Sequence, residues 1–279
     1  MSDKFVDLHI HTNLSDGSFT PSQVVRLARE KGISAIAITD HDTVKGVEEA
    51  LAEGEKEGVE VIAGVELSCD CCGEEVHVVG LFVDWKDKEL QETLEKRVRE
   101  RERRVKEILK KLENLGMVIT PQKMENFYRG KVPGRLLIAR IMVEKGWVKD
   151  LDEAFEKYLN EGGLAYVPSR RKRGREIVEI IEKAKGIPVL AHPQYLDKPE
   201  IVIPEMVKEG IKGLEVYFPE NGTTPSLKFL FYAEKYHLLL SAGSDCHGEN
   251  KERLLLGTVK APYSILEEMK KWHRQRYGC

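Results

Sequence analysis

Most histidines of this chain stand beside the ends of predicted strands, together with acidic residues. His9 and His11 are separated by one residue in the run FVDLHIH, so an extended backbone directs both side chains to one face. A single histidine at a strand end is more often an ordinary polar residue, but six of the eight histidines occupy such positions. The nine candidate ligands are His9, His11, Asp16, His41, Glu66, His77, His192, Asp245 and His247. Imidazole and carboxylate without thiolate suit zinc, manganese or iron, and this many ligands require two or three divalent cations.

Short β-branched runs alternate with helical patterns in the first third of the chain. The runs FVDLHI, ISAIAIT and VEVIAGVEL are separated by predicted helices at 21–31 and 44–57, which predicts a parallel sheet covered by helices. A strand EVHVVGLFVD follows Gly73 and is expected to pair with the strand before it, and IPVLAHP, GLEVYF and HLLLSAGSD resume the pattern later. The carboxyl ends of parallel strands share the edge where α/β folds place active sites, so we expect the candidate ligands to converge there.

Residues 88–164 interrupt this alternation with amphipathic patterns whose apolar residues recur at steps of three and four. The helices predicted within this segment are 88–116, 133–145 and 151–160. We therefore expect a barrel built from residues 1–87 and 165–279 that carries the metal site. The helical insertion at 88–164 is expected to form a cap on the substrate side.

Length and composition limit the class of protein. The 279 residues suffice for one α/β barrel with an insertion, and 44 Lys and Arg against 47 Asp and Glu give a net charge of −3, which identifies no charged partner. We expect a cytoplasmic protein without membrane contact or an obligate protein partner, because no signal-like segment and no run of roughly 18 apolar residues occurs. The five cysteines form no disulfide framework, and the cluster Cys69, Cys71 and Cys72 could bind a soft metal but lacks a second partner pair.

Several motifs carry a resemblance to a known family. They are HIHTNLSDGSFTP, ITDHDTVKG, GVELS, AHP and GSDCHG, with EGGLAYVP at the exit of the insertion. They resemble the successive motifs of the polymerase and histidinol phosphatase family, the PHP domain, and especially its stand-alone phosphoesterases acting on nucleotides. The resemblance covers nearly the whole chain and implies an α/β fold, a distorted (β/α)7 barrel with a helical insertion.

The resemblance also implies three metal ions. One would be held by His9, His11, Glu66 and Asp245. A second, sharing Glu66, would be held by His77 and His192, and a third by Asp16, His41 and His247. Asp42 belongs to the second motif, and its alternative role is to orient or cap the loop after the second strand.

The expected activity is that of a metal-dependent phosphoesterase. Closely spaced divalent cations lower the pKa of a bridging water and neutralise phosphate oxygens, so a metal-bound hydroxide is expected to attack phosphorus. His192, Asp245 and His247 are the candidates for catalytic proton transfer, although a residue bound to metal cannot shuttle a proton freely. The expected substrate is a phosphorylated small molecule, a nucleotide such as a 3′,5′-bisphosphate or a nucleoside monophosphate.

Substrate contacts are expected from the insertion and its exit. The family's nucleotide phosphatases carry a pattern like G-R-P-H-I-A-R, and residues 134–140 read GRLLIAR, which keeps Arg135 for a bidentate phosphate contact and replaces the histidine by Leu137. The basic run 170–175 begins with Arg170 and Arg171, which could anchor a distal phosphate or a short oligonucleotide. The alternative for this run is a charged loop that leads into a helix.

Other functions use the same or related motifs. A 5′→3′ exonuclease acting on short RNA or DNA would use the basic loop, and histidinol-phosphate phosphatase shares the metal motifs. A metal amidohydrolase would use a similar His-x-His barrel, but it requires a bridging lysine on strand four that we do not find. A non-catalytic module, as the domain can be within polymerases, would need polymerase sequence attached.

Overall fold

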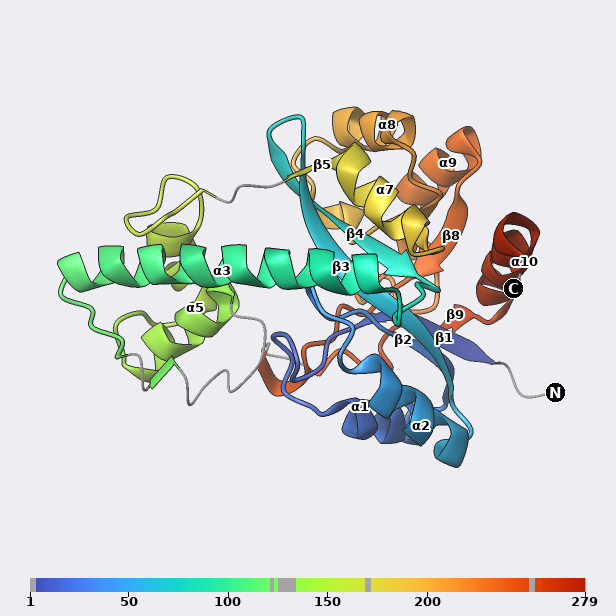
Figure 1. The fold of residues 1–279 in the computed structure, drawn as a ribbon, viewed down its shortest axis with the longest axis horizontal. Helices are drawn as coiled ribbons and strands as arrows, with labels where there is room; N and C mark the ends of the chain where they lie inside the picture. Colours follow the sequence, from blue (N-terminus) through green and yellow to red (C-terminus); the bar gives the residue numbers. More distant parts are fainter. Residues whose placement is uncertain (1–3, 121–122, 125–133, 169–171, 251–253, 279) are drawn as a thin grey trace.

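The strands of the chain form one mixed sheet that curls into a nearly closed barrel (Figure 1). The computed structural model describes residues 4–120, 123–124, 134–168, 172–250 and 254–278. The strands are β1 (Phe5–Ile10), β2 (Ile33–Ile38), β3 (Glu60–Cys71), β4 (Glu74–Leu81), β5 (Lys172–Arg173), β6 (Ile187–Leu190), β7 (Gly213–Tyr217), β8 (Leu239–Ala242) and β9 (Ala261–Pro262). They lie in the order β8-β7-β6-β4-β3-β2-β1-β9, with β5 paired to β3. A parallel bridge between Ile10 and Cys246 links the end of β1 to the chain after β8, which almost closes the ring.

Two strands run against their neighbours, β4 within the barrel and the short β9 beside β1. β1, β2 and β3 pair in parallel, as do β6, β7 and β8, whereas β4 is antiparallel to both β3 and β6. The predicted pairing of this strand with the one before it is confirmed, and the parallel order of the neighbouring strands does not extend to β4. The reason is the tight turn at Cys72 and Gly73, where both residues have a positive φ and the chain reverses directly after β3. The start of β4 consequently lies near the edge where the parallel strands end.

Helices lie around the outside of the barrel (Figure 1). They are α1 (Pro21–Glu30), α2 (Val47–Glu57), α7 (Gly174–Lys183), α8 (Pro199–Glu209), α9 (Leu227–Tyr236) and α10 (Ser264–Tyr277). α1 begins as the sequence predicts, because Thr20 Oγ1 accepts a hydrogen bond from the Gln23 amide at 3.2 Å and Pro21 occupies the first turn. α2 ends at Gly58, whose φ of 69° is the left-handed conformation that stops a helix. The alternation of strands and helices confirms the predicted α/β barrel.

Residues between β4 and β5 form helices that extend away from the barrel (Figure 1). They are α3 (Lys88–Asn114), α5 (Arg135–Glu144) and α6 (Leu151–Ala154), the last followed by a π-helical turn at Phe155–Leu159. The first part of α3 packs Leu90 into the barrel core, whereas Ile108 belongs to a separate core that it shares with Ile138 of α5. α3 therefore joins two hydrophobic cores and lies across the edge of the barrel that carries the candidate ligands.

Candidate metal centre

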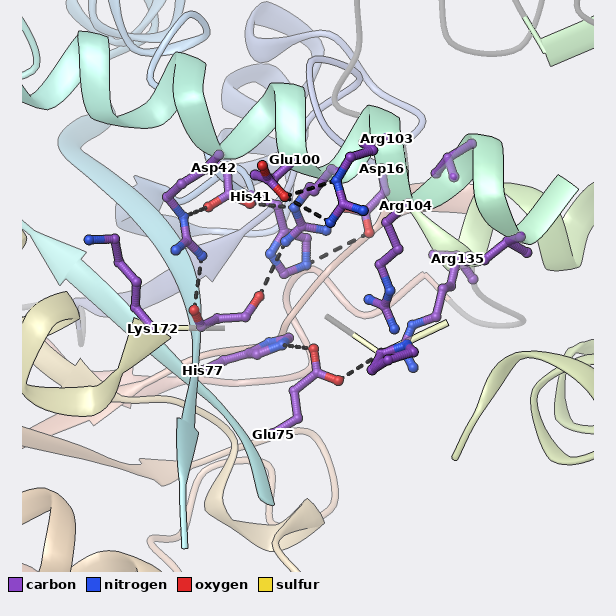
Figure 2. Close-up of a pocket in the computed structure, with 18 of the residues that line it drawn as sticks. Asp16, His41, Asp42, Glu75, His77, Glu100, Arg103, Arg104, Arg135 and Lys172 are labelled. Atoms are coloured by element: carbon purple, nitrogen blue, oxygen red, sulfur yellow. Dashed lines mark hydrogen bonds and ion pairs between the residues drawn. The ribbon is translucent and has the colours of Figure 1, made fainter. Parts of the chain in front are cut away.

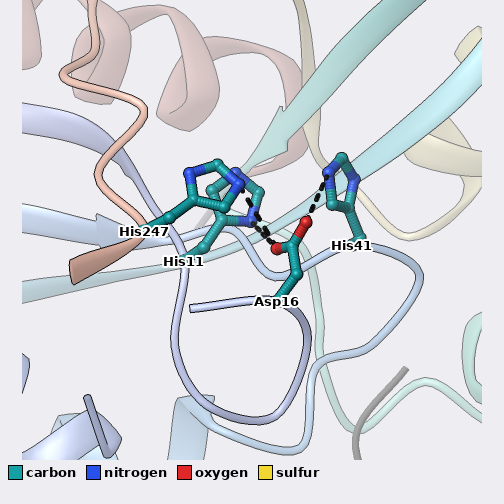
Figure 3. A group of neighbouring side chains, drawn as sticks. All are labelled: His11, Asp16, His41 and His247. Atoms are coloured by element: carbon teal, nitrogen blue, oxygen red, sulfur yellow. Dashed lines mark ion pairs between the residues drawn. The ribbon is translucent and has the colours of Figure 1, made fainter. Parts of the chain in front are cut away.

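The candidate ligands meet at one edge of the barrel. Their nitrogen and oxygen atoms form three groups, and within each group they all lie within 4.8 Å of one another. The groups are His9, His11, Glu66 and Asp245; His11, Asp16, His41 and His247 (Figure 3); and His41, Glu66 and His77. His192 reaches the same centre, because its Nε2 lies 3.1 Å from Glu66 Oε1. The structure thus brings together all nine residues that the sequence singles out.

Glu66 lies in the middle of this cluster. Its Oε1 is 2.8 Å from His77 Nδ1 and 3.1 Å from His192 Nε2. Its Oε2 is 3.0 Å from His41 Nδ1 and 3.1 Å from His11 Nε2. Burial opposes ionisation of this carboxyl, but the surrounding imidazoles hold its pKa well below the ordinary value. With His9 Nε2 at 3.4 Å from Oε2, one buried carboxylate therefore contacts five imidazoles, an arrangement suited to bridging two cations.

Several buried polar atoms of the cluster lack a hydrogen bond within the described part of the chain. They are Glu66 Oε2, His11 Nδ1 and His41 Nδ1. His41 Nδ1 and Glu66 Oε2 lie 3.0 Å apart but are not aligned as donor and acceptor. Buried polar groups are normally satisfied, so lone pairs that converge without bonding one another fit a cation between them.

The imidazoles respond strongly to the carboxylates around them. Burial favours their neutral form, yet Asp245 and Glu66 raise the pKa of His11 to about 10, and Glu66 raises the pKa of His77 to about 9. For His41, burial dominates and lowers the pKa to about 3. The high proton affinity of His11 and His77 shows a negative potential that would also attract a divalent cation.

The loops that present the ligands include strained backbone positions. His192, directly after β6, has a φ of 30°, and Asp245, after β8, has a φ of 50°. Such conformations cost residues other than glycine on the order of 1 kcal/mol or more each, and they persist where the surrounding structure enforces them. The strain therefore coincides with two of the candidate ligands.

Asp40 shapes the loop that carries Asp16. The Asp40 carboxylate accepts hydrogen bonds from the Thr12 amide at 2.7 Å, the Thr12 hydroxyl at 2.6 Å and the Ser15 hydroxyl at 2.5 Å. All of these groups are buried. Asp40 thus fixes residues 12–15, and with them the position of the next residue, Asp16.

Sequence reasoning missed Glu215, which supports two candidate ligands. This buried residue of β7 has Oε1 at 2.8 Å from His9 Nδ1, and its Oε2 accepts a hydrogen bond from the His192 amide at 2.5 Å. A carboxylate can only accept, so His9 Nδ1 carries the proton and Nε2 presents its lone pair to the cluster. The signal in the sequence was a single acidic residue within the apolar run GLEVYF.

A cleft of about 410 Å³ lies beside the cluster, between the barrel and the insertion helices (Figure 2). The guanidinium groups of Arg97 and Arg101, both on α3, bind the buried carboxylate of Asp42. Burial opposes the ionisation of Asp42, but these two arginines lower its pKa below the ordinary value. Asp42 is in none of the three ligand groups among the described residues, and it ties α3 to the loop after β2.

The predicted substrate contacts have different outcomes. Arg135 lines the cleft, and its Nη2 donates to Glu75 Oε2 at 2.8 Å (Figure 2). Arg170 and Arg171 lie outside the described residues, while the basic run continues with Lys172 in β5, which also lines the cleft. The candidate metal groups among the described residues contain no cysteine. Burial raises the pKa of the Cys71 thiol, which disfavours a thiolate there.

A barrel whose strand ends gather histidines and carboxylates around one point defines a metal-dependent hydrolase. The model of the PHP domain family matches residues 7–160, and the chain belongs to this family. The resemblance seen in the motifs is thereby confirmed, and with it the class of metal-dependent phosphoesterases.

Individual relatives cover most of the chain. It is 31% identical over 250 residues to a 5′-3′ exoribonuclease of Haemophilus influenzae, covering 88% of this chain and 90% of the relative. It is 32% identical over 248 residues to a 3′,5′-nucleoside bisphosphate phosphatase of Chromobacterium violaceum, covering 87% of each. A solved structure from Bifidobacterium adolescentis, described as an inferred metal-dependent phosphoesterase, matches with a TM-score of 0.85 and 27% identity over 98% of this chain and 96% of that one. Among the described residues, no helix has both the length and the apolar character needed to cross a bilayer.

Proposed function

We propose that the chain removes a phosphate group from a nucleotide, with a 3′,5′-nucleoside bisphosphate as the first candidate substrate and a nucleoside monophosphate as the second. The observation that carries the proposal is Glu66, whose two oxygens contact five imidazoles in a buried cluster beside a cleft. The similarity to a relative named 3′,5′-nucleoside bisphosphate phosphatase supports this substrate class. The cleft volume of about 410 Å³ lies in the range of small-molecule sites, roughly 300–1,000 Å³.

In this proposal the cluster holds two or three divalent cations, manganese, zinc or iron. The ligands are the eight residues of the three groups described above, His9, His11, Asp16, His41, Glu66, His77, Asp245 and His247, together with His192, which contacts Glu66. When bound, such cations lower the pKa of water and neutralise phosphate oxygens. Glu66 joins the sets, and Glu215 and Asp40 hold His9 and the Asp16 loop in place.

The chain's other residues position the substrate. The segment 88–164 acts as a cap on a barrel formed by 1–87 and 165–279, and Arg135 and the basic run that starts at Arg170 and Arg171 contact phosphate. His192, Asp245 and His247 are the candidates for proton transfer to the leaving group.

A second candidate is a 5′→3′ exonuclease acting on short oligonucleotides. It is supported by the similarity to a relative named 5′-3′ exoribonuclease and by the basic residues of α3 that line the cleft. Histidinol-phosphate phosphatase is a third candidate, supported by shared family motifs alone.

The test is a screen of phosphate esters with protein reconstituted with manganese, zinc or iron. Phosphate release from adenosine 3′,5′-bisphosphate should exceed release from a nucleoside monophosphate and from histidinol phosphate, and a labelled oligonucleotide should separate the exonuclease by the release of mononucleotides. His9→Ala should abolish turnover, while His273→Ala, a histidine outside the three ligand groups, should not. Parent protein with no activity on any of these esters would refute the proposal.

A further inference from the structure

Glu75 connects the metal centre to the insertion. It lies on β4 two residues before His77, so both side chains leave the strand on the same face. Its Oε2 accepts a hydrogen bond from Arg135 Nη2 at 2.8 Å, and its Oε1 lies 3.7 Å from His77 Nε2 (Figure 2). One carboxylate thus contacts both a candidate ligand and the arginine expected to bind phosphate.

Three of the four other arginines that line the cleft are also engaged by carboxylates, whereas Arg104 donates to the Val167 carbonyl at 2.8 Å. Arg101 binds Asp42, whose side chain is only 1% exposed, so breaking that pair would leave a buried charge. Arg103 pairs with Glu100 at 3.0 Å on the exposed side of α3. An anion that binds Arg135 must therefore exchange with the carboxylate already bound to it. Glu75 is suited to this exchange, because its side chain is 24% exposed and lies next to His77.

Arg135 makes one short hydrogen bond and two long ones, so a new acceptor could improve its hydrogen bonding. Arg135 Nη2 donates to Glu75. Arg135 Nη1 lies 3.5 Å from the Leu159 carbonyl and 3.4 Å from Asn160 Oδ1, and both distances are long for hydrogen bonds. A phosphate group can accept from both guanidinium nitrogens at once, and bidentate pairs are the stronger ones. Phosphate is therefore a better partner for Arg135 than Glu75 is, and the two compete for it.

We infer that Glu75 is a specificity-determining residue that occupies Arg135 in the free protein and gives way to a second phosphate group of the substrate. The inference rests on the proposed function. The first phosphate of the substrate lies at the metal centre, and the second replaces the Glu75 carboxylate on Arg135. The negative charge of Glu75 opposes this exchange, so it sets the affinity for substrates with two phosphates and has little effect on those with one.

The test compares Glu75→Gln with the parent. KM for adenosine 3′,5′-bisphosphate should fall by about five- to tenfold, the change expected for one exchanged ion pair, while KM for a nucleoside monophosphate should change by less than about twofold. In an Arg135→Gln background the same substitution should have no effect. Glu74→Gln is the matched control, because the neighbouring residue loses the same charge, bonds the Asp197 amide and does not line the cleft.

Equilibrium binding separates this inference from the proposed function. The chain in excess chelator is titrated with adenosine 3′,5′-bisphosphate, and Glu75→Gln should lower the Kd by the same factor whether or not the parent turns over any ester. An unchanged Kd, together with an unchanged ratio of KM values, would overturn the inference even if the parent is an active phosphatase. An equal loss of kcat on both substrates, without a change in KM, would also overturn it, since Glu75 would then only position His77.

Discussion

Replacing Glu215 by glutamine tests whether this residue controls the metal centre from outside the ligand set. The substitution keeps the shape of the side chain but removes its charge and makes one of its two acceptors a donor. If the amide oxygen continues to accept from the His192 amide, the new NH2 group faces His9 Nδ1. That nitrogen must then accept, which moves the proton to Nε2, the atom that faces Glu66 and Asp245.

The size of the effect follows from the bonds that are lost. Glu215 makes two hydrogen bonds as a buried carboxylate, and the amide can satisfy only one of the two donors in the original way. A hydrogen bond to a charged group contributes about 1.5–3 kcal/mol, which corresponds to about ten- to hundredfold in metal affinity. Substitutions of residues that orient metal ligands usually weaken binding by about the same range, ten- to hundredfold.

The assay is a competition titration of manganese or zinc against a chromophoric chelator, with circular dichroism to show that the fold persists. Glu53→Gln is the control, because Glu53 is a largely buried carboxylate with two partners, Arg26 and Lys56, on a helix that carries no candidate ligand. A folded Glu215→Gln protein that binds metal within about twofold of the parent would refute the assignment of Glu215 as the residue that orients His9.

Three further predictions follow from the same contacts. Asp42→Asn should destabilise the protein by about 3 kcal/mol in urea unfolding, because two arginines lose a buried carboxylate. The pKa of Asp42 is lowered in the folded protein, so its contribution to stability is present above pH 3.8 and is lost as the pH falls further. His9→Ala or Asp245→Ala should reduce turnover by more than about tenfold with the fold intact. Metal uptake at pH 7.5 should release protons, because carboxylates oppose the effect of burial and raise the pKa of His11 to about 10 and of His77 to about 9; calorimetry in buffers of different ionisation enthalpy measures this release.

Each of these predictions has an outcome that contradicts it. An Asp42→Asn protein as stable as the parent would show that the contacts with α3 contribute little. Activity of either ligand variant within tenfold of the parent would count against the metal centre. A binding enthalpy independent of buffer would show that the metal-free imidazoles are neutral. The raised pKa values also predict that the metal-free protein is more stable below pH 6.5 and loses this stability as the pH rises through about 9 and 10.

The sequence allowed the candidate ligands to be grouped before the fold was known, because their signal is local. His9 and His11 are two residues apart on a predicted strand, and the run ITDHD places His41 just after another predicted strand. The two-residue period of a strand and the shared edge of a barrel are therefore enough to group these residues. The helices were also predictable, since Thr20 with Pro21 marks the start of α1, and the apolar period of α3 runs without interruption.

The supporting contacts could not be predicted, because they join residues that are distant in the chain. Glu215 meets His9 across 206 positions, and Arg101 meets Asp42 across 59. No local pattern specifies either pair, since a buried acidic residue in a strand and an arginine on a charged helix face fit many partners. The roles of Glu215 and Arg101 follow from the fold, which places β7 within the barrel and α3 across the loop after β2.

The reversed strand β4 explains how one hairpin serves both the metal centre and the cleft. A parallel strand would end at this edge and leave through a loop, whereas β4 begins here as a regular pleat, with Glu75 and His77 on one face and about 6.8 Å apart along the strand. This spacing lets His77 reach Glu66 at 2.8 Å while Glu75, one step further out, reaches Arg135 of the insertion. The departure from a parallel sheet therefore fixes the distance between the candidate metal ligand and Arg135, the proposed phosphate contact. A loop in the same place would leave that distance variable.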